Sequence, residues 1–384
     1  MKRRICVVVT ARPTYSRIRS ALQAIAGSEE LELQLVVGAS ALLHDYGHAV
    51  SHISDDGFDI AAKAYMVLEG ENPTAMAKTA GIGLVELSTI FDNLKPDFVV
   101  TVADRYETIA TALASSYMNI PTVHVQGGEV TGSIDEKVRH AVTKLADYHF
   151  VCTDLARQNV LRMGEDPSTV FNTGCPSIDL AGAVLQDPDL DFDPVEKYGG
   201  VGAEADLSNG YIVVLQHPVT TEYEDARAQI TETLEAVRDL EKPVLWFWPN
   251  PDAGSDGTSE GIRAFREQNP GDRIHFFKNM GPVDFLKLLV NCDCIAGNSS
   301  VAIRECAYLG VPAVNVGTRQ LGRERGRNVI DVGYERGEIR AAIDKQLTAP
   351  RPERDLVYGD IGAGERIAEL LARIEPRVDK RLTY

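Results

Sequence analysis

Short runs of β-branched and apolar residues alternate with longer helical patterns along this chain of 384 residues. Parallel strands need long crossover connections, usually helices, so this alternation predicts a doubly wound parallel sheet in each half of the chain. The predicted strands lie at 5–10, 33–37, 98–102, 122–125 and 149–152, and at 211–216, 244–248, 274–277, 294–296 and 313–316. The predicted helices between them include 105–117, 135–146 and 300–309.

The chain is long for a single hydrophobic core, so we expect two domains. The strand and helix patterns are interrupted between residues 182 and 209, where Asp, Pro and Gly are frequent. Such a composition is typical of linkers. We therefore predict a first Rossmann-like domain at 1–181, a linker at 182–209 and a second domain at 210–384. A last helix near 364–374 has no strand after it, so its packing partner is open, and the first domain is one alternative.

The charge balance excludes several partners. A formal net charge of -17 disfavours nucleic acid and anionic membranes, which are bound by clustered cations. No apolar run approaches the ~20 residues of a membrane span. The six cysteines form no C-x-x-C pair and are typical of reduced thiols, so we expect a cytoplasmic protein. A small anion needs only a few cations, and the chain offers a local group of Arg319, Arg323, Arg325 and Arg327.

A metal site is not expected. His44, His48 and His52 recur at every fourth position, but Gly47 interrupts the helix that would bring them onto one face. We therefore interpret these histidines as solvated surface residues and not as metal ligands.

Ionisable residues follow two predicted strands of the first half. Asp104 and Arg105 come directly after strand 98–102, where a parallel sheet delivers residues to its carboxyl edge. Such positions are common sites of proton transfer. The alternative is that Asp104 caps the helix that follows, and spacing alone does not decide between the two.

The next predicted strand, 122–125, is followed by Gln126 and then by Gly127 and Gly128. Paired glycines let a backbone approach a ligand closely. Glu129 and Asp135 lie just beyond them and are further candidate carboxylates, with solvated loop positions as the alternative.

The second half offers a predicted anion site. Asn298, Ser299 and Ser300 precede a predicted helix whose first N–H groups could hold a phosphate, although the same residues would also serve as an ordinary cap. Glu305 lies about a turn and a half into this helix, where it could accept hydrogen bonds from ribose hydroxyls. His217 follows strand 211–216 at the same expected edge.

Several long motifs resemble the hydrolysing UDP-N-acetylglucosamine 2-epimerases, which supply N-acetylmannosamine and related sugars for sialic-acid-type synthesis. They are RPTYS, DYGH, DDGFDI, ADR, GGEVTGSIDEKVRHAVTKLADYH, GCPSIDL, LQHPVTTEY, PNPDAGS, GNSSVAIRE and VGTRQLGRERGRNVI, in this order. The resemblance implies a GT-B architecture of two Rossmann-like domains that face a central cleft holding the nucleotide sugar. It also implies no cofactor, no metal, and a homodimer or homotetramer.

The resemblance also assigns roles to residues. Acid and base roles fall on Asp104 and Asp135, and His217 lies near the diphosphate. Well-known members carry a carboxylate immediately before Gly-Gly-Glu, where this chain has Gln126, so Glu129 is the nearest replacement. Nucleotide contacts fall on Arg12, Ser16, Arg105, Asn250, Ser299, Ser300, Glu305 and Arg319.

The implied reaction removes the carbon 2 proton as UDP leaves, which gives a 2-acetamidoglucal. Water then adds at carbon 1 while a proton returns to the opposite face of carbon 2. Three alternatives stay open: a non-hydrolysing epimerase, a GT-B glycosyltransferase, and a binding-only regulator. The sequence leaves open the nucleotide, UDP or GDP, and the sugar, N-acetylglucosamine or a 4-amino-6-deoxy relative.

Overall fold

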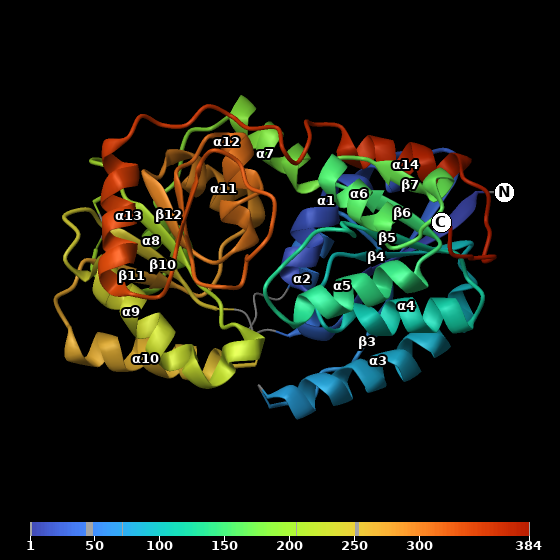
Figure 1. The fold of residues 1–384 in the computed structure, drawn as a ribbon, viewed down its shortest axis with the longest axis horizontal. Coiled ribbons are helices and arrows are strands. Elements are labelled where there is room, and N and C mark those ends of the chain that lie inside the picture. The colour runs from blue at the N-terminus through green and yellow to red at the C-terminus, as the bar shows by residue number, and fades with distance from the viewer. Residues whose placement is uncertain (1, 44–48, 71, 205, 250–252, 384) are drawn as a thin grey trace. The chain divides into compact units, whose positions relative to one another are not determined.

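The computed structural model describes residues 2–43, 49–70, 72–204, 206–249 and 253–383 (Figure 1). These residues form two compact units. Unit 1 consists of Met1–Val130, Ile134–Leu180 and Tyr358–Tyr384, and unit 2 of Thr131–Ser133 and Ala181–Val357. Each unit has its own sheet and its own hydrophobic core.

The sheet of unit 1 has seven parallel strands in the order β3-β2-β1-β4-β5-β6-β7. Its strands are β1 (Arg3–Val9), β2 (Leu31–Gly38), β3 (Ile60–Ala64), β4 (Phe98–Val102), β5 (Thr122–Val125), β6 (Tyr148–Val151) and β7 (Val170–Asn172). Its helices are α1 (Arg12–Gly27), α2 (Ala49–Asp55), α3 (Pro73–Leu94), α4 (Thr108–Tyr117), α5 (Ile134–Leu145), α6 (Asp154–Arg162) and α14 (Ala363–Arg373), and α7 (Ser177–Gln186) runs from unit 1 into unit 2.

Alternating side chains of β1 fill both faces of this sheet, as the two-residue period of a strand requires. Ile5, Val7 and Val9 pack in one core cluster with α1 and α14. Cys6 and Val8 pack in another with α3 and α4. Burial on both faces explains why the sequence of this central strand contains a continuous apolar run.

Unit 2 has a second seven-stranded sheet, in the order β14-β13-β12-β9-β10-β11-β8, in which only the edge strand β8 is antiparallel. Its strands are β8 (Val201–Gly202), β9 (Ile212–Leu215), β10 (Val244–Phe247), β11 (Ile274–Phe277), β12 (Cys294–Gly297), β13 (Ala313–Val316) and β14 (Val329–Val332). Its helices are α8 (Pro194–Tyr198), α9 (Ala226–Arg238), α10 (Ser255–Gln268), α11 (Pro282–Asn291), α12 (Glu305–Leu309) and α13 (Arg336–Thr348).

All ten predicted strands are present, and the prediction of two Rossmann-like parallel-sheet domains is confirmed. Four strands were not predicted: β3, β7, β8 and β14. All four are the end strands of their sheets, and they are short or poor in uninterrupted β-branched sequence.

The prediction of one continuous helix over 300–309 was wrong. A 3₁₀ turn, η5 (Ser300–Ala302), comes first, and the α-helical hydrogen-bonding pattern begins only at Glu305. Arg304 has a ψ of -73°, which tilts its peptide away from regular α-helical geometry. Helix α4 also begins three residues later than predicted, at Thr108.

The segment expected to be a linker, 182–209, lies within unit 2. It contains α8 and β8, and β8 pairs with β11. Lys287 of α11 accounts for part of this order, because its ammonium group lies 2.8 Å from Asp187 and 3.3 Å from Asp191. The acidic residues that suggested a solvated linker therefore contact a lysine of the same unit.

The last helix, α14, belongs to unit 1 and packs on α1. A Cβ atom at Gly364 would lie 2.5 Å from the backbone of Ser20, so only glycine permits this approach. The carboxylate of Asp179 accepts hydrogen bonds from the N–H groups of residues 362, 363 and 364 at 2.6, 3.1 and 2.8 Å. Asp179 thus satisfies N–H groups at the helix start that have no partner within the helix. Among the described residues, no helix combines the length and the apolar character needed to cross a membrane.

Candidate active site

Two neighbouring strands of unit 1 end in residues with left-handed backbone. Ala103 follows β4 with a φ of 63°, and Gln126 follows β5 with a φ of 67°. Residues with a side chain adopt this conformation at a cost of about 1–2 kcal/mol, so the surrounding structure must hold it. The N–H of Ala103 donates to Val125 at 2.8 Å, and that of Gln126 donates to Phe150 at 2.9 Å. Both turns direct the chain out of the sheet at its carboxyl edge.

The guanidinium group of Arg139 connects two of the predicted carboxylate residues. This fully buried side chain bonds the carboxylate of Asp104 and donates to the backbone oxygen of Glu129 at 2.9 Å. It also contacts Glu136 at 3.3 Å, and Arg17 approaches Asp104 at 3.7 Å. The structure therefore brings Asp104 and Glu129 together around one cation.

The sequence places Arg139 in the same ionisable segment as Asp104, Glu129 and Asp135, but it predicts no separate role for Arg139 and none for Arg17. The available signal was the position of Arg139, four residues after Asp135 on the same predicted helix. Asp135 itself is half-buried in the first turn of α5. The alternative that Asp104 caps a helix is wrong, because α4 begins four residues later and has Glu107 at its cap position.

Gln126 is fully buried, and its amide nitrogen donates to the sulfur of Cys175 at 3.2 Å. The same sulfur lies 3.1 Å from the hydroxyl oxygen of Ser177. The position at which the resemblance predicts a carboxylate is therefore occupied by an amide that contacts a thiol. A carboxylate at this buried position would carry the cost of a buried charge, which an amide avoids.

The glycine pair has a structural explanation that differs from the predicted one. A Cβ atom at Gly127 would lie 2.8 Å from Nδ1 of His124 and 3.0 Å from Oγ1 of Thr143. One at Gly128, whose φ is 78°, would collide with the backbone oxygen of Ala156 on α6. The glycines thus let the loop approach the protein's own side chains and helix.

Three predicted nucleotide contacts also lie in unit 1. Arg12 opens α1, and burial lowers the pKa of its guanidinium to about 10, so it stays charged at neutral pH. The hydroxyl of Ser16 donates to the backbone oxygen of Arg12 at 3.3 Å. Arg105 is paired with the fully buried Glu107 at 2.7 Å. The structure therefore gives Arg105 a protein partner that the sequence pattern did not indicate.

Asn298 organises the predicted anion site of unit 2. Its side-chain oxygen accepts from the N–H of His217 at 2.7 Å, and its side-chain nitrogen donates to the His217 carbonyl at 2.8 Å. Its own carbonyl accepts from Arg319 at 3.2 Å and from Gln320 at 2.8 Å. Asn298 therefore fixes the ends of β9 and β12 and holds His217 and Arg319 near Ser299.

The remaining predicted contacts lie close by in the chain. Ser299 caps η5 by accepting from the N–H of Val301 at 3.4 Å, and Ser300 and Glu305 are buried. Gly132 donates its N–H to the backbone oxygen of Arg319 at 3.1 Å, which anchors residues 131–133 within unit 2. Asn250 lies outside the described residues, as do His44 and His48 of the histidine triplet.

Comparison with known proteins adds an independent line of observation. Residues 23–372 match the family described as UDP-N-acetylglucosamine 2-epimerase. A UDP-N,N'-diacetylbacillosamine 2-epimerase (hydrolyzing) from Legionella pneumophila is 33% identical over 375 residues, which cover 97% of each chain. A UDP-N-acetylglucosamine 2-epimerase from Neisseria meningitidis is 28% identical and covers 97% of this chain and 95% of its own.

Solved structures with a similar fold include a protein of the same description. A crystal structure of the UDP-N-acetylglucosamine 2-epimerase from Neisseria meningitidis bound to UDP-N-acetylglucosamine superimposes with a TM-score of 0.77. The superposition covers 97% of this chain and 100% of the other, at 16% sequence identity. The overall architecture is therefore GT-B-like.

Proposed function

Because this chain belongs to the UDP-N-acetylglucosamine 2-epimerase family, we propose that it is a hydrolysing 2-epimerase of UDP-linked 2-acetamido sugars. It would convert UDP-N-acetylglucosamine, or its 2,4-diacetamido-6-deoxy relative, and water to UDP and the free 2-epimeric sugar. The observation that supports this best is the arrangement of Asp104, Arg139 and Glu129 at one sheet edge. We assign the product to sialic-acid-type sugar synthesis in the cytoplasm.

Asp104 is the proposed base. The proton on carbon 2 is weakly acidic, so it can leave only as the bond from carbon 1 to the diphosphate oxygen breaks. Asp104 accepts that proton, the electron pair of the carbon–hydrogen bond forms the double bond between carbons 1 and 2, and UDP departs with the pair from the broken carbon–oxygen bond. Arg139 orients the carboxylate, which retains further lone pairs for the proton.

Cations and N–H groups are the proposed stabilisers of the leaving diphosphate, and electrostatic stabilisation of this kind is usually a large contribution to catalysis. Arg12 is half-buried and burial lowers its pKa, so the negative charge of a diphosphate would compensate its lost hydration. The remaining proposed nucleotide contacts are Ser16, Arg105, Asn250, Ser299, Ser300, Glu305, Arg319 and His217.

The second half-reaction needs a group that activates water and a group that returns a proton to the opposite face of carbon 2. Glu129 and Asp135 are the proposed carboxylates, because Gln126 cannot exchange a proton at neutral pH. Water supplies the hydroxyl at carbon 1, so the sugar is released free and inverted at carbon 2.

A turnover assay tests the proposal. The purified protein is incubated with UDP-N-acetylglucosamine, with UDP-N,N'-diacetylbacillosamine, and with the GDP forms of both sugars. We expect free nucleotide and the free 2-epimer in equal amounts, and one deuterium at carbon 2 when the solvent is D₂O. A UDP-linked 2-epimer without free UDP would instead identify a non-hydrolysing epimerase.

The substrate comparison also decides between the two sugars. The relative from Legionella pneumophila favours the diacetamido sugar, whereas the family description favours N-acetylglucosamine. A difference in kcat/KM of at least tenfold would assign the physiological substrate class. We propose a homodimer or homotetramer, and the molar mass from light scattering tests this.

A further inference from the structure

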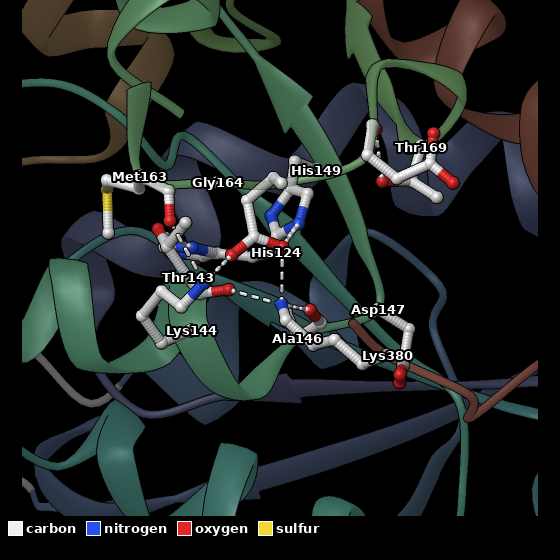
Figure 2. Close-up of polar contacts among 12 residues, drawn as sticks. His124, Thr143, Lys144, Ala146, Asp147, His149, Met163, Gly164, Thr169 and Lys380 are labelled. Atoms are coloured by element: carbon white, nitrogen blue, oxygen red, sulfur yellow. Dashed lines mark hydrogen bonds and ion pairs between the residues drawn. The ribbon is translucent and has the colours of Figure 1, made fainter. Parts of the chain in front are cut away.

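His124 lies on β5 with its imidazole ring fully buried. Its Nε2 atom is 2.9 Å from the backbone oxygen of Ala103. Its Nδ1 atom is 3.1 Å from Oγ1 of Thr143, and Figure 2 shows His124 and Thr143. A carbonyl oxygen can only accept, so Nε2 carries the hydrogen and Thr143 donates to Nδ1. Burial lowers the pKa of His124 to about 3, which keeps the ring neutral at physiological pH.

The bond to Ala103 fixes a conformation that this residue does not favour. Ala103 has a φ of 63°, and its N–H already donates to Val125. With His124 on its carbonyl, both polar backbone groups of Ala103 are bound to β5. Asp104, the proposed base, is the next residue, so the direction of its Cα–Cβ bond depends on this turn. Glycine would adopt the same conformation without a side chain to disfavour it.

The ring also contacts the other two segments that build the carboxylate site. Thr143 lies one helical turn after Arg139 on α5, so both project from the same side of that helix. Gly127 passes so close that a Cβ atom there would lie 2.8 Å from Nδ1 of His124. His124 therefore touches the turn before Asp104, the helix that carries Arg139, and the loop that leads to Glu129.

We propose that His124 is a positioning residue for the epimerase reaction, which holds Ala103 in its left-handed conformation and thereby orients the carboxylate of Asp104. The inference rests on the proposed function, because it takes Asp104 as the base. His124 itself exchanges no proton with the substrate. The chain needs such a residue because it carries alanine, and not glycine, before Asp104.

Two amide substitutions separate this role from general packing. The side-chain nitrogen of glutamine reaches about as far as Nε2, whereas that of asparagine reaches only the position of Nδ1. His124→Gln should retain most of the kcat, within about fivefold, and His124→Asn should lower kcat by about 10- to 100-fold with KM changed less than about threefold. Adding Ala103→Gly to His124→Asn should restore a large part of the kcat, because the left-handed turn then needs no support.

If His124 only stabilised the folded protein, His124→Asn would have a lower melting temperature, but the kcat of its folded fraction would stay at the wild-type level. That result would overturn the proposal. Failure of Ala103→Gly to restore kcat would also overturn it. If His124→Asn does not fold, His124→Gln carries the test: a folded protein that has lost more than tenfold in kcat contradicts the inference.

A spectroscopic measurement is independent of turnover. Nitrogen-15 NMR of the wild-type protein with labelled histidine should show His124 as the neutral Nε2–H tautomer throughout pH 6–8. A charged ring or the Nδ1–H tautomer would refute the inference even in an active enzyme. Conversely, a wild-type protein that turns over none of the nucleotide sugars would refute the proposed function, while the NMR result would still report on the bond to Ala103.

Discussion

At the scale of single residues, Asp104 is a buried acid at the end of a strand that two arginines approach. We predict that Asp104→Asn lowers kcat by roughly 10²- to 10⁴-fold, the usual effect of losing a general base, and leaves the Kd of UDP nearly unchanged. Turnover assays and calorimetry with UDP measure the two effects. Asp92→Asn, at an exposed ion pair on α3, is a matched control. Equal loss of UDP binding and activity would make Asp104 a structural residue.

Glu129 and Asp135 differ in their surroundings. We use this difference to predict which of them performs the proton transfer that the amide of Gln126 cannot perform. Glu129 is 6% exposed and shares Arg139 with Asp104 through its backbone, whereas Asp135 is half-buried in the first turn of α5. We predict that Glu129→Gln lowers kcat at least as much as Asp135→Asn, and that Gln126→Glu keeps activity or changes the preference between nucleotide sugars. Steady-state kinetics on both sugars test this. Full activity of Glu129→Gln would refute the replacement of the missing carboxylate by Glu129.

The strand pattern was sufficient to place Asp104 at the sheet edge, because the residue after a parallel strand is placed by the fold itself, and the resemblance supplied its proposed role as an acid or base. The sequence was not sufficient to predict the contacts of Arg139 or any role for His124, because a buried side chain bridges elements whose separation in space is independent of their separation in sequence. Asn298 shows the same limit: its pattern left an anion site and an ordinary cap as alternatives, whereas its side chain spans the ends of β9 and β12 by bonding the backbone of His217.

At the scale of elements, the turn η5 determines what Ser300 can do. Ser299, and not Ser300, caps η5, so a substitution at position 300 does not remove the capping side chain. We predict that Ser300→Asp weakens UDP binding by at least about 100-fold, because its carboxylate would repel the phosphates. Ser300→Ala, which adds no charge, is the control. Unchanged affinity of Ser300→Asp in calorimetry would exclude a phosphate site at this turn.

Prediction of elements from sequence succeeded where burial on two faces imposes a continuous apolar run, as in β1 and β12. It failed at the end strands and at helix starts, where tertiary contacts decide. The two residues of β8 are a strand only because β11 offers a free edge, and α8 is ordered beside Asp284, which bonds Tyr198 at 2.7 Å.

At the scale of the whole molecule, unit 1 is completed by the end of the chain. Residues 358–384 supply α14 and a following segment in which Lys380 lies near the end of α5 (Figure 2). The ammonium group of Lys380 donates to the backbone oxygen of Thr143 at 3.1 Å and lies 2.6 Å from the buried carboxylate of Glu165. His149 and Lys144 bind the same carboxylate at 2.9 and 2.5 Å. Unit 1 therefore acquires its full set of contacts only when the last residues are in place.

This cluster makes the stability of unit 1 sensitive to acid. Burial by itself would raise the pKa of Glu165, but hydrogen bonds from His149, Lys144 and Lys380 outweigh it and lower the pKa to about 2. Since this value lies below that of the unfolded chain, the contribution of Glu165 to the free energy of unfolding is complete above pH 4.5 and is lost as the pH falls from about 4.5 to 2. Its size is on the order of 3 kcal/mol.

We predict that Lys380→Met removes about 1–2 kcal/mol of this contribution at pH 7, which lowers the melting temperature by about 3–6 °C. The difference in stability between the variant and the wild type should shrink towards pH 2. Calorimetric scans at pH 7 and pH 3 test this, with Arg381→Met, an exposed neighbour paired with Asp379, as the control. A difference that is the same at both pH values would show that Lys380 stabilises unit 1 by packing and not through the charge of Glu165.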